Sequence, residues 1–182
     1  MLTRDDIHSD ADLMRYVELA IGRAYQFVGQ FVGAHRTDRA VVARILWEHG
    51  AQSSAVQIAV EQYITRQIGE PAYDVAEAQA AQEHLENLAE RGFTSEALAR
   101  SAPGAHRGGG WEELRETERA YSEATRGLAA HAGAVRAAVD AWWRGHTSTL
   151  EALCDKHAGL LLAARRTLPS ATQHAQAVII AS

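Results

Sequence analysis

The sequence contains a single cysteine, Cys154, and only three prolines. One cysteine excludes a disulfide within the chain, and it excludes zinc and iron–sulfur sites built from cysteines of this chain.

No stretch approaches the roughly 18 consecutive apolar residues of a membrane span. The acidic N-terminal residues also lack the pattern of a Sec-type signal peptide, in which basic residues are followed by an apolar segment. We therefore expect a cytoplasmic protein with no membrane partner. The net charge of -5 also argues against a nucleic-acid partner, which a basic surface would bind.

The residues that are present are typical of a soluble all-α protein. The chain has 182 residues, of which 47% are hydrophobic and 23% charged, and this predicts one globular domain over residues 1–182. Apolar residues recur about every 3.6 positions without a clear period of two, which favours helices over strands. Short polar residues suited to capping mark the starts of the first two expected helices, at Ser9 or Asp10 and at Thr37 or Asp38. Gly69 followed by Pro71 marks the end of the second. These helices lie at about 10–34, 37–68, 73–91, 95–101, 111–143 and 148–168.

The four longest predicted helices are arranged as two hairpins joined by a crossover. A tight turn connects 10–34 with 37–68, and a second turn at Gly145 connects 111–143 with 148–168. Ser148 and Glu151 match a capping box at the start of the last helix. The crossover holds the shorter helices and a Gly-rich segment at 101–110, which we expect to be flexible. Because helices joined by tight turns pack antiparallel, the sequence predicts an antiparallel four-helix bundle.

Each of the four long helices carries one glutamate or histidine within its apolar stripe. The four are Glu18, His49, His131 and His157. At about 1.5 Å per residue, the two members of each hairpin are level within roughly one helical turn. Inward-facing carboxylate and imidazole groups at one height are how helical bundles hold metal ions, so these four residues predict a site for zinc, iron, manganese or copper. A haem between two histidines is a second version, and histidines satisfied by hydrogen bonds within the core are the alternative. A metal or haem would suit a redox or sensing function.

A second hypothesis about the function comes from the tripeptide Trp143, Arg144 and Gly145. This tripeptide, between two predicted helices, resembles the Trp-x-Gly turn of the small helical hairpins exported by type VII secretion. The resemblance covers about 111–168, and the family's C-terminal Tyr-x-x-x-Asp/Glu signal is missing after the last helix. It implies a non-enzymatic helical interaction or adaptor protein. Such a protein would form a homo-oligomer or bind a helical partner through exposed aromatic residues, for which Trp47 and Trp142 are further candidates.

The sequence leaves open whether the protein is an enzyme. Arg126 and His131 have a spacing that resembles the Arg-x4–6-His motif of the all-α HEPN ribonucleases, which implies action on a phosphate. Cys154 lies on an apolar stripe, where we expect a buried small hydrophobe and not a nucleophile. No Ser-based nucleophile motif occurs.

Overall fold

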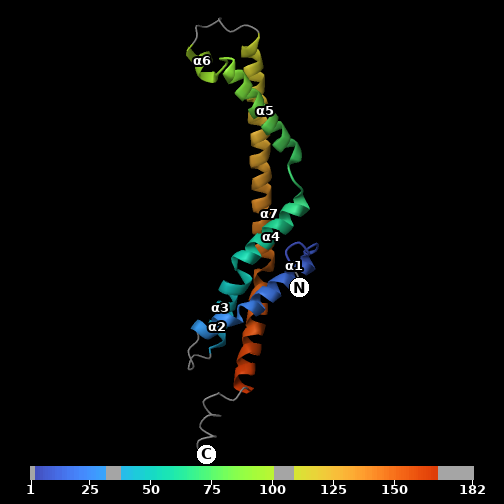
Figure 1. Cartoon of the computed structure of the whole chain (residues 1–182). Helices are drawn as coiled ribbons and strands as arrows, with labels where there is room; N and C mark the ends of the chain where they lie inside the picture. Colours follow the sequence, from blue (N-terminus) through green and yellow to red (C-terminus); the bar gives the residue numbers. More distant parts are fainter. Residues whose placement is uncertain (1–2, 32–37, 101–108, 168–182) are drawn as a thin grey trace, which may run out of the picture. The chain divides into compact units, whose positions relative to one another are not determined.

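The computed structural model describes residues 3–31, 38–100 and 109–167, and every regular element within these ranges is a helix (Figure 1). The all-α prediction is therefore confirmed. The chain divides into two compact units. Unit 1 consists of Met1–Ile64 and Val139–Ser182, and unit 2 of Thr65–Ala138. The prediction of a single domain stays a prediction. In the described part of the chain, no helix is both long enough and apolar enough to cross a bilayer.

The first predicted helix, 10–34, is interrupted in unit 1. Helix α1 covers Asp10–Arg23 and helix α2 covers Tyr25–Phe31, with Ala24 in a turn between them. Ser9 caps α1 as expected: its hydroxyl accepts from the Asp12 amide, and the Asp12 carboxylate accepts from the Ser9 amide. The hydrogen bond from the Ser9 hydroxyl also lowers the pKa of Asp12.

The second predicted helix, 37–68, begins and ends as expected but is broken in the middle. Helix α3 covers Arg39–Leu46 after the Asp38 cap, the π-helical turn η1 covers Trp47–Ala51, and helix α4 covers Ser54–Ile68. The break lies at Gly50, where η1 packs directly on α1. A Cβ at Gly50 would lie 2.7 Å from the Cα of Ile21, so this close approach requires glycine. After α4, Gly69 has a φ of 89°, which favours glycine and ends the helix.

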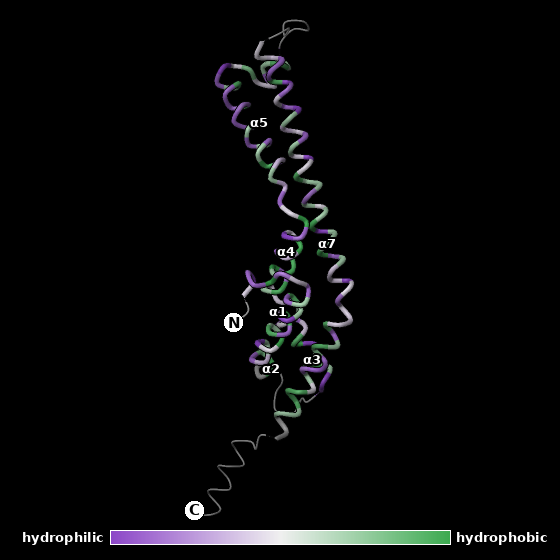
Figure 2. The backbone as a smooth tube through the Cα atoms, turned by 90° about the vertical axis from the view of Figure 1, so that its right-hand side faces the viewer, coloured by the Kyte–Doolittle hydropathy of each residue, from purple (hydrophilic) through white to green (hydrophobic). Residues whose placement is uncertain are grey.

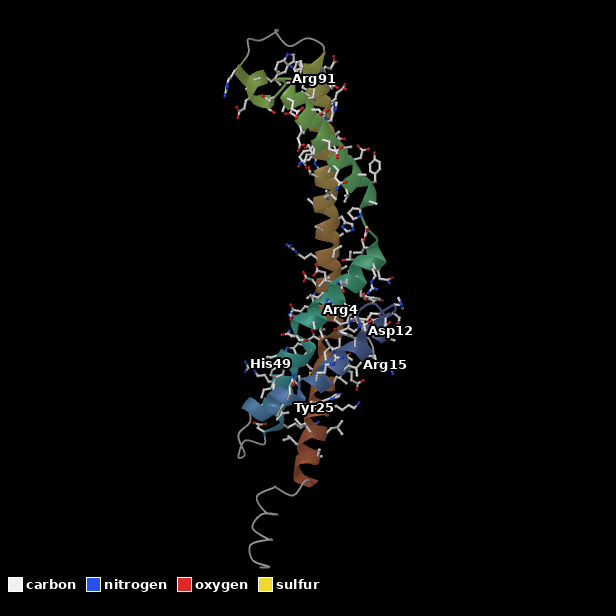
Figure 3. The ribbon with its side chains drawn as sticks, in the orientation of Figure 1. Arg4, Asp12, Arg15, Tyr25, His49 and Arg91 are labelled. Atoms are coloured by element: carbon white, nitrogen blue, oxygen red, sulfur yellow. The ribbon has the colours of Figure 1, made fainter. Side chains whose placement is uncertain are left out.

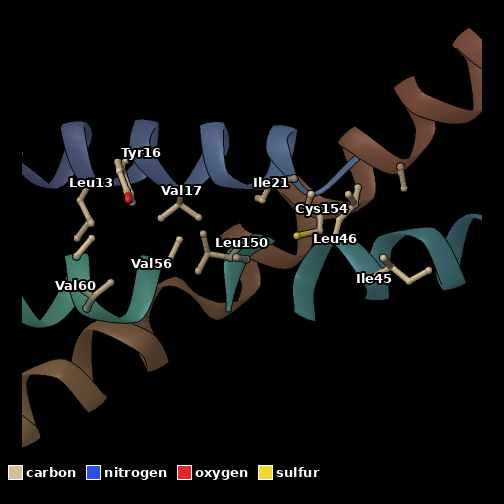
Figure 4. Packing of buried hydrophobic residues seen from close by; sticks show 14 of the residues in the cluster. Leu13, Tyr16, Val17, Ile21, Ile45, Leu46, Val56, Val60, Leu150 and Cys154 are labelled. Atoms are coloured by element: carbon tan, nitrogen blue, oxygen red, sulfur yellow. The ribbon is translucent and has the colours of Figure 1, made fainter. Parts of the chain in front are cut away.

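The core of unit 1 lies between α1, α3, α4 and the C-terminal half of helix α7, which covers Gly110–Thr167. Leu13, Val17 and Ile21 point from α1 towards side chains of the other helices (Figure 4). Leu13, Val17 and Ile21 are fully buried, and their spacing of four residues is typical of the buried face of an amphipathic helix. Their partners on the other helices include Leu46, Val56, Val60, Leu150 and Cys154.

Helix α7 corrects the predicted second hairpin. The sequence predicts helices at 111–143 and 148–168 with a turn at Gly145, but residues 110–167 form one helix. The reason is that a stripe of inward-facing residues continues through the expected turn at every fourth position. His146 in this stripe is half-buried, and the others are buried: Trp142, Leu150, Cys154, Ala158 and Leu162. A single interior glycine costs a helix only about 1 kcal/mol, which this burial exceeds. The capping box at Ser148 is therefore not formed, and the antiparallel four-helix bundle is not confirmed.

Unit 2 is built on an antiparallel pair of helices. Helix α5 covers Ala72–Glu90 and helix α6 covers Ser95–Arg100, close to the predicted 73–91 and 95–101. Along α5 and the first half of α7, polar and hydrophobic residues alternate (Figure 2). His131 contacts Gly69 near the start of α5, whereas Glu113 pairs with His84 near its end, so the two helices run in opposite directions. The predicted Gly-rich loop at 101–110 lies outside the described residues, except for Gly109 and Gly110.

Candidate functional site

The structure brings together two of the four residues predicted to bind a metal. In unit 1, the Nε2 atom of His157 lies 3.2 Å from the Oε1 atom of Glu18. His49 is also in unit 1, but its ring stacks on Phe27 with the centroids 4.9 Å apart. His131 belongs to unit 2, where its Nε2 donates to the backbone carbonyl of Gly69 at 2.8 Å. Across the described residues, no three His, Cys, Asp or Glu side chains form a group able to hold a metal ion.

The π-helical turn explains why His49 leaves the predicted stripe. A π-helix places more residues in each turn than an α-helix, so the side chains after its start are rotated relative to the regular 3.6-residue pattern. Gly50 and Ala51 take the buried positions, while His49 is half-buried and Gln52 is exposed. The regular pattern resumes with Val56 and Ala59 in α4, both fully buried.

His157 lies in the middle of a short hydrogen-bonded chain. The Tyr25 hydroxyl is 2.6 Å from its Nδ1, and Glu18 is on the other side of the ring. Burial, and secondly the negative charge of Glu18, raise the pKa of Tyr25, so the phenol keeps its proton and donates to Nδ1. The Nε2–H then donates to the carboxylate. Both nitrogens of a side chain that is only 12% exposed are thereby satisfied, which matches the predicted alternative of hydrogen-bonded core histidines.

Glu18 also lines an open groove of about 560 Å³ between α1 and α7, which we call the α1–α7 groove. Each helix contributes four residues at i, i+3, i+4 and i+7. They are Ala11, Met14, Arg15 and Glu18 from α1, and Thr149, Ala152, Leu153 and Lys156 from α7. Residues with this spacing share one face of a helix. The groove is therefore the seam left open between two helix faces.

The two rows are level because the helices run in the same direction. Asp10 contacts His146 at one end of the groove, and Glu18 contacts Lys156 at the other. The first contact is part of a larger anchor: Asp10 accepts from the Trp142 indole at 2.7 Å and from His146 Nε2 at 3.2 Å. The His146 ring stacks on Trp142 with a centroid distance of 4.4 Å. This anchor holds the first turn of α1 against α7.

Of the charged side chains that line the groove, Glu18 and Lys156 are paired with each other and Arg15 is not paired within the described residues. Glu18 accepts a hydrogen bond from His157 and lies 3.7 Å from the Nζ of Lys156. Arg15 is exposed and has no ion-pair or hydrogen-bond partner among the residues that the structure describes (labelled in Figure 3). The groove thus combines an apolar floor at Met14 and Leu153 with one unpaired cation.

Two further expectations concern α7. Trp143, Arg144 and Gly145 lie inside the helix, so the turn on which the type VII resemblance rests is not formed.

Cys154 is almost fully buried, and burial raises its pKa to about 12. The buried position confirms Cys154 as a core residue, and the raised pKa leaves little of the thiolate, which is the nucleophilic form of cysteine.

Comparison with known proteins gives no assignment. No family model matches this chain, and no significant match was found among curated proteins or among solved structures. The proposals below therefore rest on the geometry of the described residues.

Proposed function

We propose that the protein is a non-enzymatic adaptor and that unit 1 binds an amphipathic helix of a partner in the α1–α7 groove. The observation that supports this is the pair of level rows, each spaced i, i+3, i+4 and i+7. Helices recognise a groove with anchors at this same spacing, so a third helix matches the seam better than an extended strand would.

The chemistry of the groove suits a helical occupant. Ala11 and Ala152 are small and exposed, so a partner backbone can approach both helices closely. Met14 and Leu153 are half-buried and supply apolar contact, and methionine adapts its shape to different partners. Each row runs over eight residues, so its first and last members are about 10 Å apart along the helix axis, which corresponds to two turns of a bound helix. With a partner helix beside α1, α4 and α7, the four-helix arrangement predicted from the sequence would be completed between molecules.

A designed amphipathic peptide with leucine on one face tests the proposal. We expect saturable binding, measured by fluorescence anisotropy, that is lost in Ala152→Glu, because the longer side chain would fill the space that a partner backbone needs next to this alanine. Ala141→Glu is the matched control: it introduces the same charge at an exposed alanine of α7 that does not line the groove. Equal binding by both variants would contradict the proposal.

The metal or haem hypothesis stays a prediction, with Glu18 and His157 as the two proposed ligands that lie together. Metal analysis and an absorption spectrum of the purified protein test it. Homo-oligomer formation and a cytoplasmic location also stay predictions. Light scattering tests the first.

A further inference from the structure

The charge pattern of the α1–α7 groove carries an inference about the partner that rests on the proposed function. We infer that the groove selects an acidic amphipathic helix, in which a carboxylate beside the apolar face pairs with Arg15. The inference deepens the proposal from a helix of any charge to one of stated chemistry.

Glu18 already has a hydrogen-bond partner and an ion-pair partner within unit 1. The Tyr25 hydroxyl fixes the His157 ring with Nε2–H directed at Glu18, and Lys156 approaches the same carboxylate oxygen, at 3.7 Å. A cation on the partner would have to displace these contacts. The acidic side chain in the groove is therefore not the one that recruits a charged partner.

Arg15 lies one turn before Glu18 on the same face of α1. Its guanidinium is exposed and has no partner in the described part of the chain. In the row it lies between Met14 and Glu18, and its counterpart in the α7 row is Leu153. A guanidinium offers parallel donors that match a carboxylate, so an acidic side chain next to an apolar anchor satisfies both features of this site.

The small number of cations in the groove favours an acidic helix over an anionic membrane surface. A membrane surface is bound by clusters of several cations, whereas the groove has only Arg15 and Lys156, and the second is paired with Glu18. A single cation set in an apolar seam instead fits one side chain of a folded partner.

Three designed peptides test the inference. They share a leucine face and differ only at the positions flanking it, which carry Glu, Gln or Lys on both sides so that the direction of binding does not matter. By fluorescence anisotropy, we expect the Glu peptide to bind about threefold to fivefold more tightly than the Gln peptide, and the Lys peptide most weakly. Added salt should weaken the Glu peptide and leave the Gln peptide nearly unchanged.

Charge reversal at Arg15 supplies the decisive comparison. Arg15→Glu should invert the order, so that the Lys peptide binds most tightly, and Arg15→Gln should remove the preference. Arg23→Glu is the matched control, since Arg23 is an exposed residue of the same helix outside the groove, and it should keep the original order. Circular dichroism shows that each variant is folded, as expected for changes at exposed positions.

The outcomes separate the inference from the proposed function. If all three peptides bind with the same affinity, or if Arg15→Glu keeps the original order, the acidic-partner inference is wrong while the groove remains a helix-binding site. If none of the three peptides binds, the proposed function itself is contradicted. Light scattering of the unliganded protein detects the remaining possibility, in which an acidic helix of a second copy occupies the groove and overturns the assignment to a separate partner.

Discussion

Gly50 is the residue at which the packing of unit 1 leaves no room for a side chain. A methyl group there would lie 2.7 Å from the Cα and 3.2 Å from the Cγ1 of Ile21. The nearer of these atoms belongs to the backbone, so a rotamer change cannot relieve the clash.

We predict that Gly50→Ala lowers the free energy of unfolding by about 1–3 kcal/mol, because overpacking at a helix contact forces backbone shifts. Gly22→Ala is the control, since a Cβ at that position of α1 meets no atom within 4 Å. It should leave stability unchanged or raise it by up to about 1 kcal/mol. Urea denaturation measures both variants, and equal stabilities would contradict the close packing of η1 on α1.

Cys154 gives a prediction about reactivity and pH. Burial raises its pKa from 9.0 to about 12, so almost no thiolate exists in the folded protein at pH 8. We expect a thiol-specific disulfide reagent to react slowly with the native protein and rapidly in denaturant. Modification at equal rates in the two states would show that the side chain is accessible.

The same pKa shift sets the direction of a stability change. The folded state holds the thiol proton more tightly than the unfolded state, so its contribution is complete below pH 9 and is lost as the pH rises towards 12. Urea midpoints should fall over this range, and they should fall less steeply in Cys154→Ala. Identical slopes for the two proteins would contradict the assignment to this thiol.

At the scale of the elements, the main difference between prediction and structure is at Gly145, where the sequence predicts a turn and the structure has the interior of helix α7. If Gly145 ended a helix in a left-handed conformation, alanine there would be destabilising. In the structure Gly145 is inside α7, and a Cβ would meet nothing within 4 Å.

We therefore predict that Gly145→Ala stabilises unit 1 by about 0.5–1 kcal/mol, from the difference in helix propensity. Gly69→Ala is the comparison, because Gly69 has a φ of 89° and alanine there should cost about 1–2 kcal/mol. Thermal melts followed by circular dichroism measure both changes. Destabilisation by Gly145→Ala would favour the predicted turn.

Most helices follow from sequence because their signals are local. The cap at Ser9, the cap at Asp38 and the stop at Gly69 depend on neighbouring residues, and all three are found as predicted. The π-helical turn and the continuity of α7 depend on contacts between distant segments, such as Gly50 with Ile21. The spacing of residues within one helix cannot predict such contacts.

The site was predictable only in part for the same reason. Glu18 and His157 come together as the sequence suggested, because both lie on buried or half-buried faces. The α1–α7 groove was missed because the expected second hairpin placed 148–168 in a separate antiparallel helix. The Asp10 contacts with Trp142 and His146 likewise join residues more than 130 positions apart, which helical periodicity cannot pair.

At the scale of the whole molecule, the two units differ in the size of their apolar cores. The hydrophobic core cluster lies within unit 1, whereas the buried residues described in unit 2 are few and include two alanines. They are Ala81, Leu88, Gly110, Leu114, Thr117 and Ala124. Because stability follows buried apolar area, unit 2 should open at lower free energy.

We predict that in hydrogen–deuterium exchange the amides of α5 exchange faster than those of α1. Leu88→Ala should accelerate exchange in unit 2, and Leu150→Ala should accelerate exchange in unit 1, since each removes a fully buried leucine. Uniform protection across the two units, with both variants acting on the whole chain, would show a single cooperative unit.

The division of unit 1 into two separated stretches of chain has a consequence for synthesis. During translation, α1 to α4 emerge first, but the α7 residues that complete their core, such as Leu150 and Cys154, follow only after Thr65–Ala138. At about 5–20 residues per second this delay is roughly 4–15 s, during which the apolar faces of α1 and α4 have no final partner. Unit 2 is contiguous and can form within that interval. The N-terminal helices are therefore the part of the nascent chain most dependent on chaperone protection, although they belong to the better packed half of the finished protein.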